Sequence, residues 1–201
     1  MLCKCIKWKK IKYISKDDIL FFVDRFYKFN NKKFKIYWCG TGEIFLHLDF
    51  PQIVNILNSI YKDKINHTIM ANGTIDRIKE FDKLDNIKFY VSIDGPKEFH
   101  EFNRGRGTYE KSINFCKKAI NLGCKKIVIR TLITKMNVYL IKDWEKEIKM
   151  IIDNSIKLSL IIPYRTEDLI KNNSLLIKNK INHDTCILPK EEIIRIFKKN
   201  S

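Results

Sequence analysis

The sequence of 201 residues lacks any apolar run close to the roughly 20 residues that a membrane-spanning helix requires. Its N-terminus is basic but has no apolar stretch of the kind found in a signal peptide. No internal repeat is visible beyond an alternation of strand-like and helix-like segments. We therefore expect no membrane segment and a cytoplasmic location, where six irregularly spaced cysteines do not predict a disulfide framework.

Acidic residues are scarce relative to basic ones. The chain has 39 lysines and arginines but 23 aspartates and glutamates, which gives a formal net charge of +16. A charge of this size attracts nucleic acid, nucleotides or an acidic partner. The lysines are spread through every segment, however, so a compositional bias toward Lys, Ile and Asn explains the charge about as well as a binding surface does. Nucleic acid therefore stays among the candidate partners.

The hydrophobic pattern predicts strands that alternate with helices around one core. Ser15 with Asp18 forms a capping box ahead of the first helix, and Asp49 caps the second. A polar loop is expected at 95–107. The predicted strands cover 34–39, 67–70, 87–93, 126–133 and 156–162. The predicted helices cover 16–30, 49–62, a short segment from Thr74, 108–122, 138–153 and 190–199.

Strands followed by helices require right-handed crossovers and hence a parallel sheet. Five strands are too few to close an eight-stranded barrel, so we predict an α/β fold with an open or partial barrel. The barrel is expected over residues 1–165. The extension over residues 166–201 would cover one edge of the sheet or dock a partner.

Polar motifs follow four of the predicted strands. The carboxyl ends of parallel strands meet at one edge of a sheet, so these motifs should converge on a single rim. That rim is where function should be sought. The motifs are GTGEIFLH at 40–47, ANGT at 71–74, VSIDGP at 91–96 and IRTLIT at 129–134.

The first two motifs offer a ligand both space and polar groups. Gly40 and Gly42 have no side chain, so a ligand can approach the backbone closely. Glu43 presents a carboxylate to a bound ammonium group or, alternatively, caps the following turn. Asn72 either orients a ligand or takes the left-handed turn conformation that precedes Gly73.

The other two motifs place polar groups on strands. Ser92 and Asp94 alternate along one strand and so share a face, where they are placed to meet ribose hydroxyls. Asp94 is followed by Gly and Pro and is equally a turn former. Arg130 lies in an apolar strand, where an unpaired guanidinium is costly, so it requires a ligand or a carboxylate. Glu43 and Asp94 are the alternative partners of Arg130.

The remaining polar candidates are weaker. Arg104 and Arg106 are flanked by glycines, and we expect them to be solvated rather than to clamp a substrate. His47 and His100 show no spacing typical of a zinc or iron site.

The cysteines fall into two groups. Cys39, Cys116 and Cys124 occupy apolar strand or helix positions, where we expect small buried side chains. Cys3 and Cys5, separated by one lysine, look like a pair of metal ligands.

In their order and spacing, these motifs resemble the core domain of the radical S-adenosylmethionine (radical SAM) superfamily over roughly residues 36–165. GTGEIFLH with Asp49 is similar to the family's GGEPLLH segment, with Ile44 where proline is usual. ANGT resembles TNGT, VSIDGPKEFHEFNRGRGTYEKSI resembles the stretch after the family's fourth strand, and IRTLITKMN resembles its fifth-strand segment. The resemblance implies a partial (β/α)6 barrel that binds a [4Fe-4S] cluster and S-adenosylmethionine.

The resemblance also implies roles for single residues. Glu43 would bind the ammonium group of S-adenosylmethionine, and Arg130 would face its carboxylate. The candidate cofactor-binding residues are Gly40, Gly42, Glu43, Asn72, Ser92 and Arg130. The implied reaction is one-electron cleavage of S-adenosylmethionine to a 5′-deoxyadenosyl radical, with a reductant protein as partner. The substrate would be a peptide, an RNA base or a small molecule.

The N-terminus departs from the family, which carries CxxxCxxC just after its first strand and supplies three thiolates to the cluster. Here the corresponding stretch is MLCKCIKW, with Cys3 and Cys5 as metal ligands and no strand before them. We therefore expect the first strand of the barrel to be absent. Three explanations stay open: an upstream start with a local residue loss, a truncated or decayed noncatalytic relative that keeps the barrel as a binding module, or a noncysteine ligand.

Overall fold

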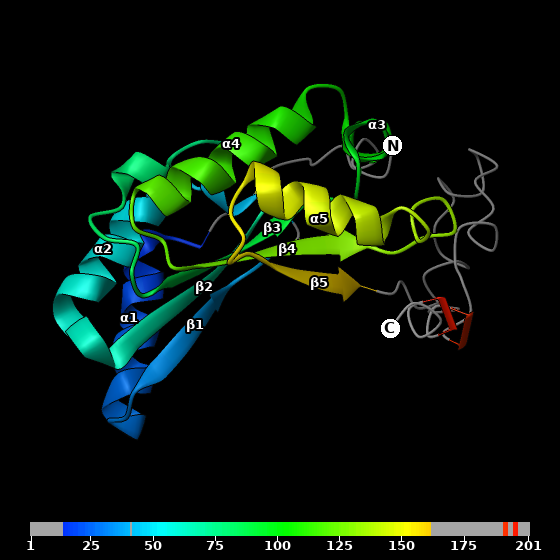
Figure 1. The fold of residues 1–201 in the computed structure, drawn as a ribbon. Coiled ribbons are helices and arrows are strands. Elements are labelled where there is room, and N and C mark those ends of the chain that lie inside the picture. The colour runs from blue at the N-terminus through cyan, green and yellow to red at the C-terminus, as the bar shows by residue number, and fades with distance from the viewer. Residues whose placement is uncertain (1–13, 41, 162–190, 193–194, 197–201) are drawn as a thin grey trace, which may run out of the picture.

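One parallel sheet forms the centre of the molecule (Figure 1). The computed structural model describes residues 14–40, 42–161, 191–192 and 195–196. The strands follow each other across the sheet in the order of the sequence, and the sheet is not closed. The predicted α/β fold with an open, partial barrel is confirmed. The strands are β1 (Phe34–Trp38), β2 (Ile65–Ala71), β3 (Ile87–Ser92), β4 (Lys126–Leu132) and β5 (Lys157–Ile161).

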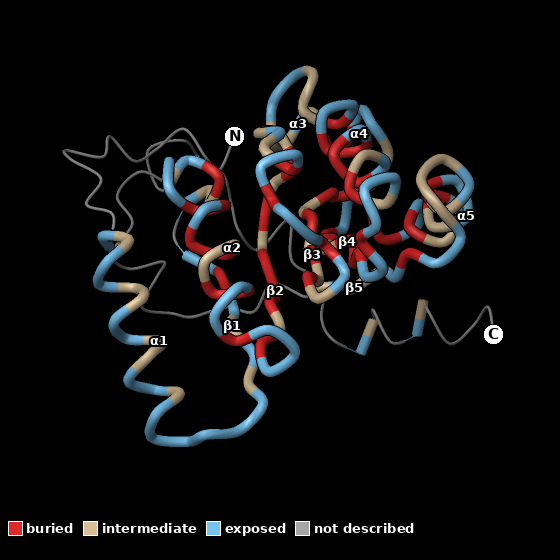
Figure 2. The backbone as a smooth tube through the Cα atoms, turned by 90° about the vertical axis from the view of Figure 1, so that its left-hand side faces the viewer, coloured by how far each residue is buried: buried red, intermediate tan, exposed pale blue. Residues whose placement is uncertain are grey.

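Helices connect the strands and cover one side of the sheet (Figures 1 and 2). None in the described part of the chain has the length and apolar content of a membrane-spanning segment. Ser15 begins the first helix as predicted, and its hydroxyl accepts the backbone N–H of Asp18 at 3.1 Å. The helices are α1 (Lys16–Asn30), α2 (Phe50–Tyr61), α3 (Lys97–Arg104), α4 (Thr108–Asn121) and α5 (Ile141–Ile151).

Two expectations about local structure were wrong. The segment expected to be a polar loop contains α3, because burial of Phe99 and His100 stabilises a helix whose sequence is otherwise mostly polar. The helix expected from Thr74 is absent from this stretch, which instead has a 3-10 turn at Ile78–Glu80. The side chain of Asn72 accepts hydrogen bonds from both the backbone N–H and the hydroxyl of Thr74, and these bonds close a turn before a helix can start.

Other differences concern element ends and segments outside the described range. Asp49 begins α2 as predicted, but its side chain makes no capping hydrogen bond. Residues 191–192 and 195–196 are helical and lie within the helix expected at 190–199. The expected absence of a first strand concerns residues 1–13, which lie outside the described residues. The proposed boundary near residue 165 does so as well.

The core lies between the sheet and the helices. Strand residues such as Ile69, Phe89 and Ile129 point into it and are fully buried. Helix residues Phe50 and Phe115 meet them, and the ring centroids of Phe89 and Phe115 lie 5.4 Å apart in an edge-on arrangement. Aromatic pairs of this geometry add about 0.5–1.5 kcal/mol beyond the burial of their area. This packing fixes which face of each strand is turned away from the helices.

A buried histidine ties the first two strands to α2. His67 accepts the indole N–H of Trp38 at Nδ1 over 3.0 Å. Its Nε2 lies 3.0 Å from the side-chain oxygen of Asn58, so the ring proton is on Nε2. Burial, together with the charge of Lys83, lowers the pKa of His67 to about 4. The neutral ring is therefore the form that the fold requires.

Stability should fall as the pH drops from 7 to 5. In the unfolded chain the pKa of His67 returns to about 6.5, so the unfolded state binds more protons between these values. The part of the stability loss that His67 contributes is about 2 kcal/mol at pH 5. Urea unfolding at the two pH values measures it. The variant His67→Gln should lose correspondingly less stability between pH 7 and pH 5. An equal loss in both proteins would contradict this role for His67.

Candidate functional site

The predicted site residues gather at the carboxyl ends of neighbouring strands (Figure 1). Glu43 follows β1, and one of its carboxylate oxygens accepts the backbone N–H of Asn72, which follows β2, at 2.6 Å. Ser92 at the end of β3 is the register partner of Arg130 on β4. The rim expected from the sequence thus exists, and it contains two directly linked pairs.

Glu43 has a structural role and retains acceptor capacity. Its Oε1 accepts the N–H of Phe45 at 3.4 Å and so caps the 3-10 turn Ile44–Leu46, as the alternative interpretation expected. Its Oε2 bonds to Asn72. Burial raises the pKa of this carboxyl group, and the two backbone N–H groups act against that shift. Each carboxylate oxygen has two lone pairs, so an ammonium group can still be accepted.

The glycines at the rim differ in the space that surrounds them. Gly73 has a φ of +74°, and a Cβ there would lie 3.0 Å from both Ser112 and Val91. A Cβ on Gly40 or Gly42 would meet no atom of the described chain within 4 Å. Their backbone therefore borders open space rather than a packed neighbour.

Asn72 is held by hydrogen bonds on three of its groups. Its side-chain oxygen accepts the N–H of Thr74 at 2.8 Å, and its carbonyl accepts the hydroxyl of Ser112 at 2.7 Å. The left-handed conformation expected as an alternative for Asn72 is wrong, because Gly73 adopts it instead. The side-chain Nδ2 of Asn72 makes no hydrogen bond within the described residues and is available to a ligand.

Arg130 has only a weak partner. Its Nη1 donates to the thioether sulfur of Met70 at 3.1 Å, and it forms no ion pair with any carboxylate in the described ranges. The expected alternative, pairing with Glu43 or Asp94, is therefore wrong. A guanidinium has five N–H donors, and a thioether is a poor acceptor. The hydroxyl of neighbouring Ser92 likewise makes no hydrogen bond to a described residue, so both side chains have unused hydrogen-bonding capacity.

Asp94 belongs to the scaffold of the site. It is buried, and both of its carboxylate oxygens accept from Arg104, at 2.7 and 3.0 Å. Its carbonyl accepts the side-chain N–H of Asn137 at 2.7 Å. The expectation that Arg104 is solvated was wrong, because α3 brings its guanidinium over Asp94, whereas Arg106 is exposed as expected.

The other candidate ligands do not assemble into a metal site within the part of the chain that the structure describes. His100 is fully buried, its Nδ1 accepts the N–H of Asp94 at 3.2 Å, and its pKa is lowered to about 4, chiefly by burial. Its Nε2 has no hydrogen-bond partner. His47 contacts the carbonyl of Ile14 at 2.9 Å.

The cysteines match the sequence-based expectation in part. Cys116 and Cys124 are buried as expected, but Cys39 is exposed just beyond β1, because the strand ends one residue earlier than predicted. Its thiol is thus at the carboxyl rim rather than in the core. The two candidate metal ligands, Cys3 and Cys5, lie outside the described residues.

The sequence did not predict several residues that support the candidate site. Met70 is the partner of Arg130, and Ser112 holds the turn at Asn72. Asn137 links the strand ends by donating to the carbonyls of Asp94 and Leu132. The short polar stretch after β4 was a signal for Asn137, since an amide after a strand is suited to bind carbonyls. Nothing in the local sequence pairs Met70 with Arg130.

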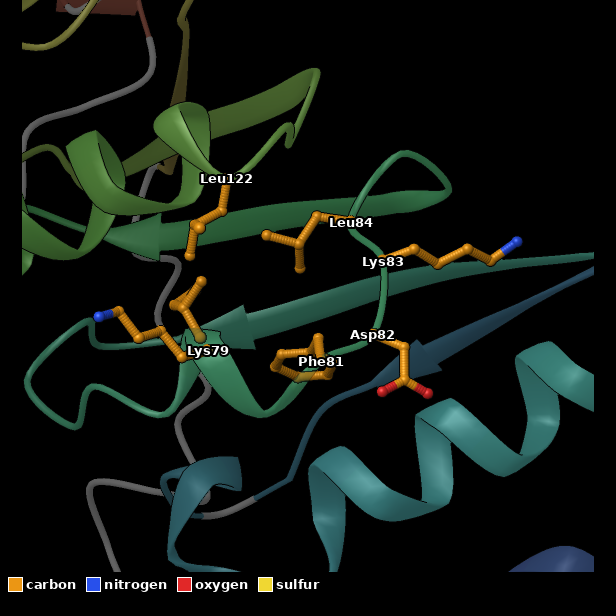
Figure 3. A pocket seen from close by; sticks show the side chains of 7 residues that line it. Lys79, Phe81, Asp82, Lys83, Leu84 and Leu122 are labelled. Carbon is orange, nitrogen blue, oxygen red and sulfur yellow. The ribbon is translucent and has the colours of Figure 1, made fainter.

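A hollow of about 300 Å³ lies away from this rim (Figure 3). Its lining comes from the segment before β3 and from the end of α4. Phe81, Leu84 and Leu122 surround it, while Lys79 and Lys83 extend away from it in opposite directions. Without polar groups that converge on a bound molecule, this hollow lacks the features of a reaction site.

Comparisons with known proteins identify the family of the chain. Residues 3–153 match the Radical SAM superfamily. The solved structure of anSMEcpe with bound AdoMet and the Cp18Cys peptide is similar, with 19% identity, a TM-score of 0.68, and coverage of 97% of this chain and 53% of that one. Streptococcus suis SuiB bound to S-adenosylmethionine has 14% identity, a TM-score of 0.64, and coverage of 96% and 41%. No curated protein sequence matches the chain.

The chain belongs to the radical SAM superfamily, because the matched residues make up most of its length. At 14–19% identity, the solved structures establish the fold, and the five-stranded sheet is a partial barrel of this type. Members of the superfamily bind S-adenosylmethionine and a [4Fe-4S] cluster. The chain spans about half the length of these solved proteins or less.

The scaffold role of Asp94 can be tested by removing its partner. Arg104→Ala should lower the free energy of unfolding by about 2–3 kcal/mol, because it leaves a buried carboxylate unpaired. Lys97→Ala removes a cation from the same helix, but its pair with Glu110 is exposed, so no measurable change is expected. Urea unfolding compares the two variants. Equal effects would contradict a special role for Asp94.

Proposed function

We propose that the carboxyl rim of this sheet binds S-adenosylmethionine beside a [4Fe-4S] cluster and that the chain is a radical SAM enzyme. The observation that carries the proposal is Arg130, a half-buried cation whose only partner among the described residues is a thioether. The proposed cofactor-binding residues are Gly40, Gly42, Glu43, Asn72, Ser92 and Arg130.

The residues present fit the methionine part of this cofactor. Arg130 would take its carboxylate, for which a guanidinium has matching geometry. Glu43 would accept its ammonium group through lone pairs that the protein leaves unused. The open space beside Gly40 and Gly42 admits the ligand, and Ser92 adds a hydroxyl without a described partner. Each charged group of the ligand would thus meet a protein side chain of the opposite charge.

We propose that Cys3 and Cys5 are ligands of the cluster, as the resemblance to the family implies. The exposed thiol of Cys39 at the end of β1 is a further sulfur available at the same rim. When bound and reduced, the cluster would supply the electron that converts S-adenosylmethionine into a 5′-deoxyadenosyl radical, which takes a hydrogen atom from the substrate. A reductant protein in the cytoplasm would be the electron source.

The protein's own contribution would be orientation. A hydrogen bond joins Glu43, after β1, to Asn72, after β2, and Asp94, after β3, accepts the backbone N–H of Leu132 on β4, so neighbouring strand ends are linked. A ligand held between Glu43 and Arg130 would therefore be fixed at both ends of its methionine part. The similar structures include three with peptides, namely anSMEcpe with Cp18Cys, anSMEcpe with Kp18Cys and SuiB with SuiA, so a peptide remains one candidate class of substrate.

Arg130→Gln tests the cofactor assignment. A charge-assisted hydrogen bond contributes about 1.5–3 kcal/mol, so the affinity for S-adenosylmethionine should fall about 10- to 100-fold. Calorimetric titration of the anaerobically reconstituted protein measures it. The thermal midpoint should hardly change, because Arg130 has no strong internal partner. Lys146→Gln, on an outer helix face, is the matched control, and equal affinity in both variants would remove Arg130 from the site.

The iron content tests the cluster ligands. After anaerobic reconstitution, Cys3→Ala and Cys5→Ala should each lose most of the bound iron, because a cluster with fewer thiolates is held weakly. Cys186→Ala removes a cysteine outside the motif and should retain the iron. Unchanged iron in the first two variants would show that other residues hold the cluster. A wild-type chain that takes up no iron would favour the noncatalytic relative.

A further inference from the structure

The charges within the sheet are all of one sign and all on one face. The five strands contain no aspartate or glutamate. Register places their basic residues together, because Lys88 pairs with Lys126, Lys157 pairs with Val128, and side chains two residues apart share a face. This face is turned away from the helix-covered core. We call it the cationic face, and it consists of Lys35, Lys88, Lys126, Arg130 and Lys157.

None of these five cations forms an ion pair with a carboxylate in the described segments. Several lysines on the helices differ, since Lys28, Lys146 and Lys149 each pair with an acidic residue of their own helix. Like charges directly opposite each other on neighbouring strands are destabilising. The sheet nevertheless places Lys88 opposite Lys126 with no internal countercharge.

Two tyrosines share the face with these cations. Tyr37 is 59% exposed, and the Nζ atom of Lys35 lies 5.8 Å from its ring centroid. Tyr90 is half-buried, and the Nζ atom of Lys88 lies 4.5 Å from its ring and donates to its hydroxyl at 2.9 Å. Aromatic rings among lysines on a sheet are the combination by which proteins bind single-stranded nucleic acid, since rings stack on bases and ammonium groups neutralise phosphates.

The two long stretches outside the described ranges are basic overall. Residues 1–13 contain five lysines and no acidic residue. Residues 162–190 contain five basic and three acidic residues. Neither stretch has a net negative charge, so we infer that the complementary charge comes from another molecule. With strands about 4.8 Å apart, the face spans roughly 19 Å from β1 to β5, which is enough for several nucleotides.

We propose that the cationic face binds single-stranded nucleic acid and that this polymer is the substrate class, a second step that rests on the proposed function. The face leads directly to the rim, because Arg130 belongs to both. Ser92 lies two residues beyond Tyr90 on the same face, and Arg130 is its register partner. A nucleotide held over Tyr90 would therefore lie next to both. Lys88, Lys126 and Lys157 would contact phosphates.

The test is fluorescence anisotropy of a labelled oligouridylate of about 12 nucleotides, titrated with the full chain at several salt concentrations without S-adenosylmethionine. The triple variant K88Q/K126Q/K157Q should weaken binding at least about 10-fold and reduce the slope of log affinity against log salt by about 2. The matched variant K28Q/K146Q/K149Q loses the same charge from the helices and should bind almost as wild type does.

A single variant guards against misfolding of the triple one. Tyr37→Leu removes an exposed ring and should weaken binding about 5-fold or more while the thermal midpoint is retained. Equal weakening by the two triple variants would overturn the proposal, because net charge alone would then explain binding. Displacement of the oligonucleotide by equimolar polyglutamate would also overturn it, in favour of an acidic peptide.

This test separates the two proposals. The affinity for nucleic acid is measured without the cofactor, and the affinity of Arg130→Gln for S-adenosylmethionine is measured without nucleic acid. Loss of specific oligonucleotide binding with intact cofactor binding would end only the substrate proposal. Oligonucleotide binding through the cationic face in a chain that never binds the cofactor would end the proposed enzyme and leave the binding face.

Discussion

Parallel pairing of five strands in sequence order is the constraint on which the rest of this molecule depends. It brings the end of every strand to one rim, so residues far apart in the chain become neighbours without any long-range motif. Glu43 and Asn72, 29 positions apart, meet through a single hydrogen bond of 2.6 Å. The bidentate pair of Asp94 and Arg104 fixes the next strand end. Part of the rim is thus held by hydrogen bonds between its own polar groups.

The two faces of the sheet differ in the side chains that they carry. One face meets the helices through apolar and aromatic side chains, with the neutral ring of His67 as a buried polar link. The other face carries cations that the fold does not neutralise. Carboxylates among these cations, or apolar residues in their place, would give a more stable sheet. We propose that this charge serves binding and that Arg130 joins the proposed cofactor site to that face.

Sequence patterns correctly predicted the features that depend on residues close together in the sequence. Strand and helix periodicity, the cap at Ser15 and the convergence of the four motifs all follow from nearest-neighbour geometry. The errors occurred where a distant partner changes a residue's environment. Arg104 is held by a carboxylate ten positions away, and α3 forms because two of its side chains find a core. Periodicity alone contains neither fact, and it likewise placed exposed Cys39 in the core.

We propose that this rim holds S-adenosylmethionine against an iron-sulfur cluster. Electron paramagnetic resonance of the reconstituted, reduced protein, recorded with and without S-adenosylmethionine, is the most direct test. In a protein that contains about four iron and four sulfide per chain by chemical analysis, we expect a signal that changes when S-adenosylmethionine is added. A reducible cluster whose signal is unaffected by saturating S-adenosylmethionine would show that cofactor and cluster do not meet at this rim.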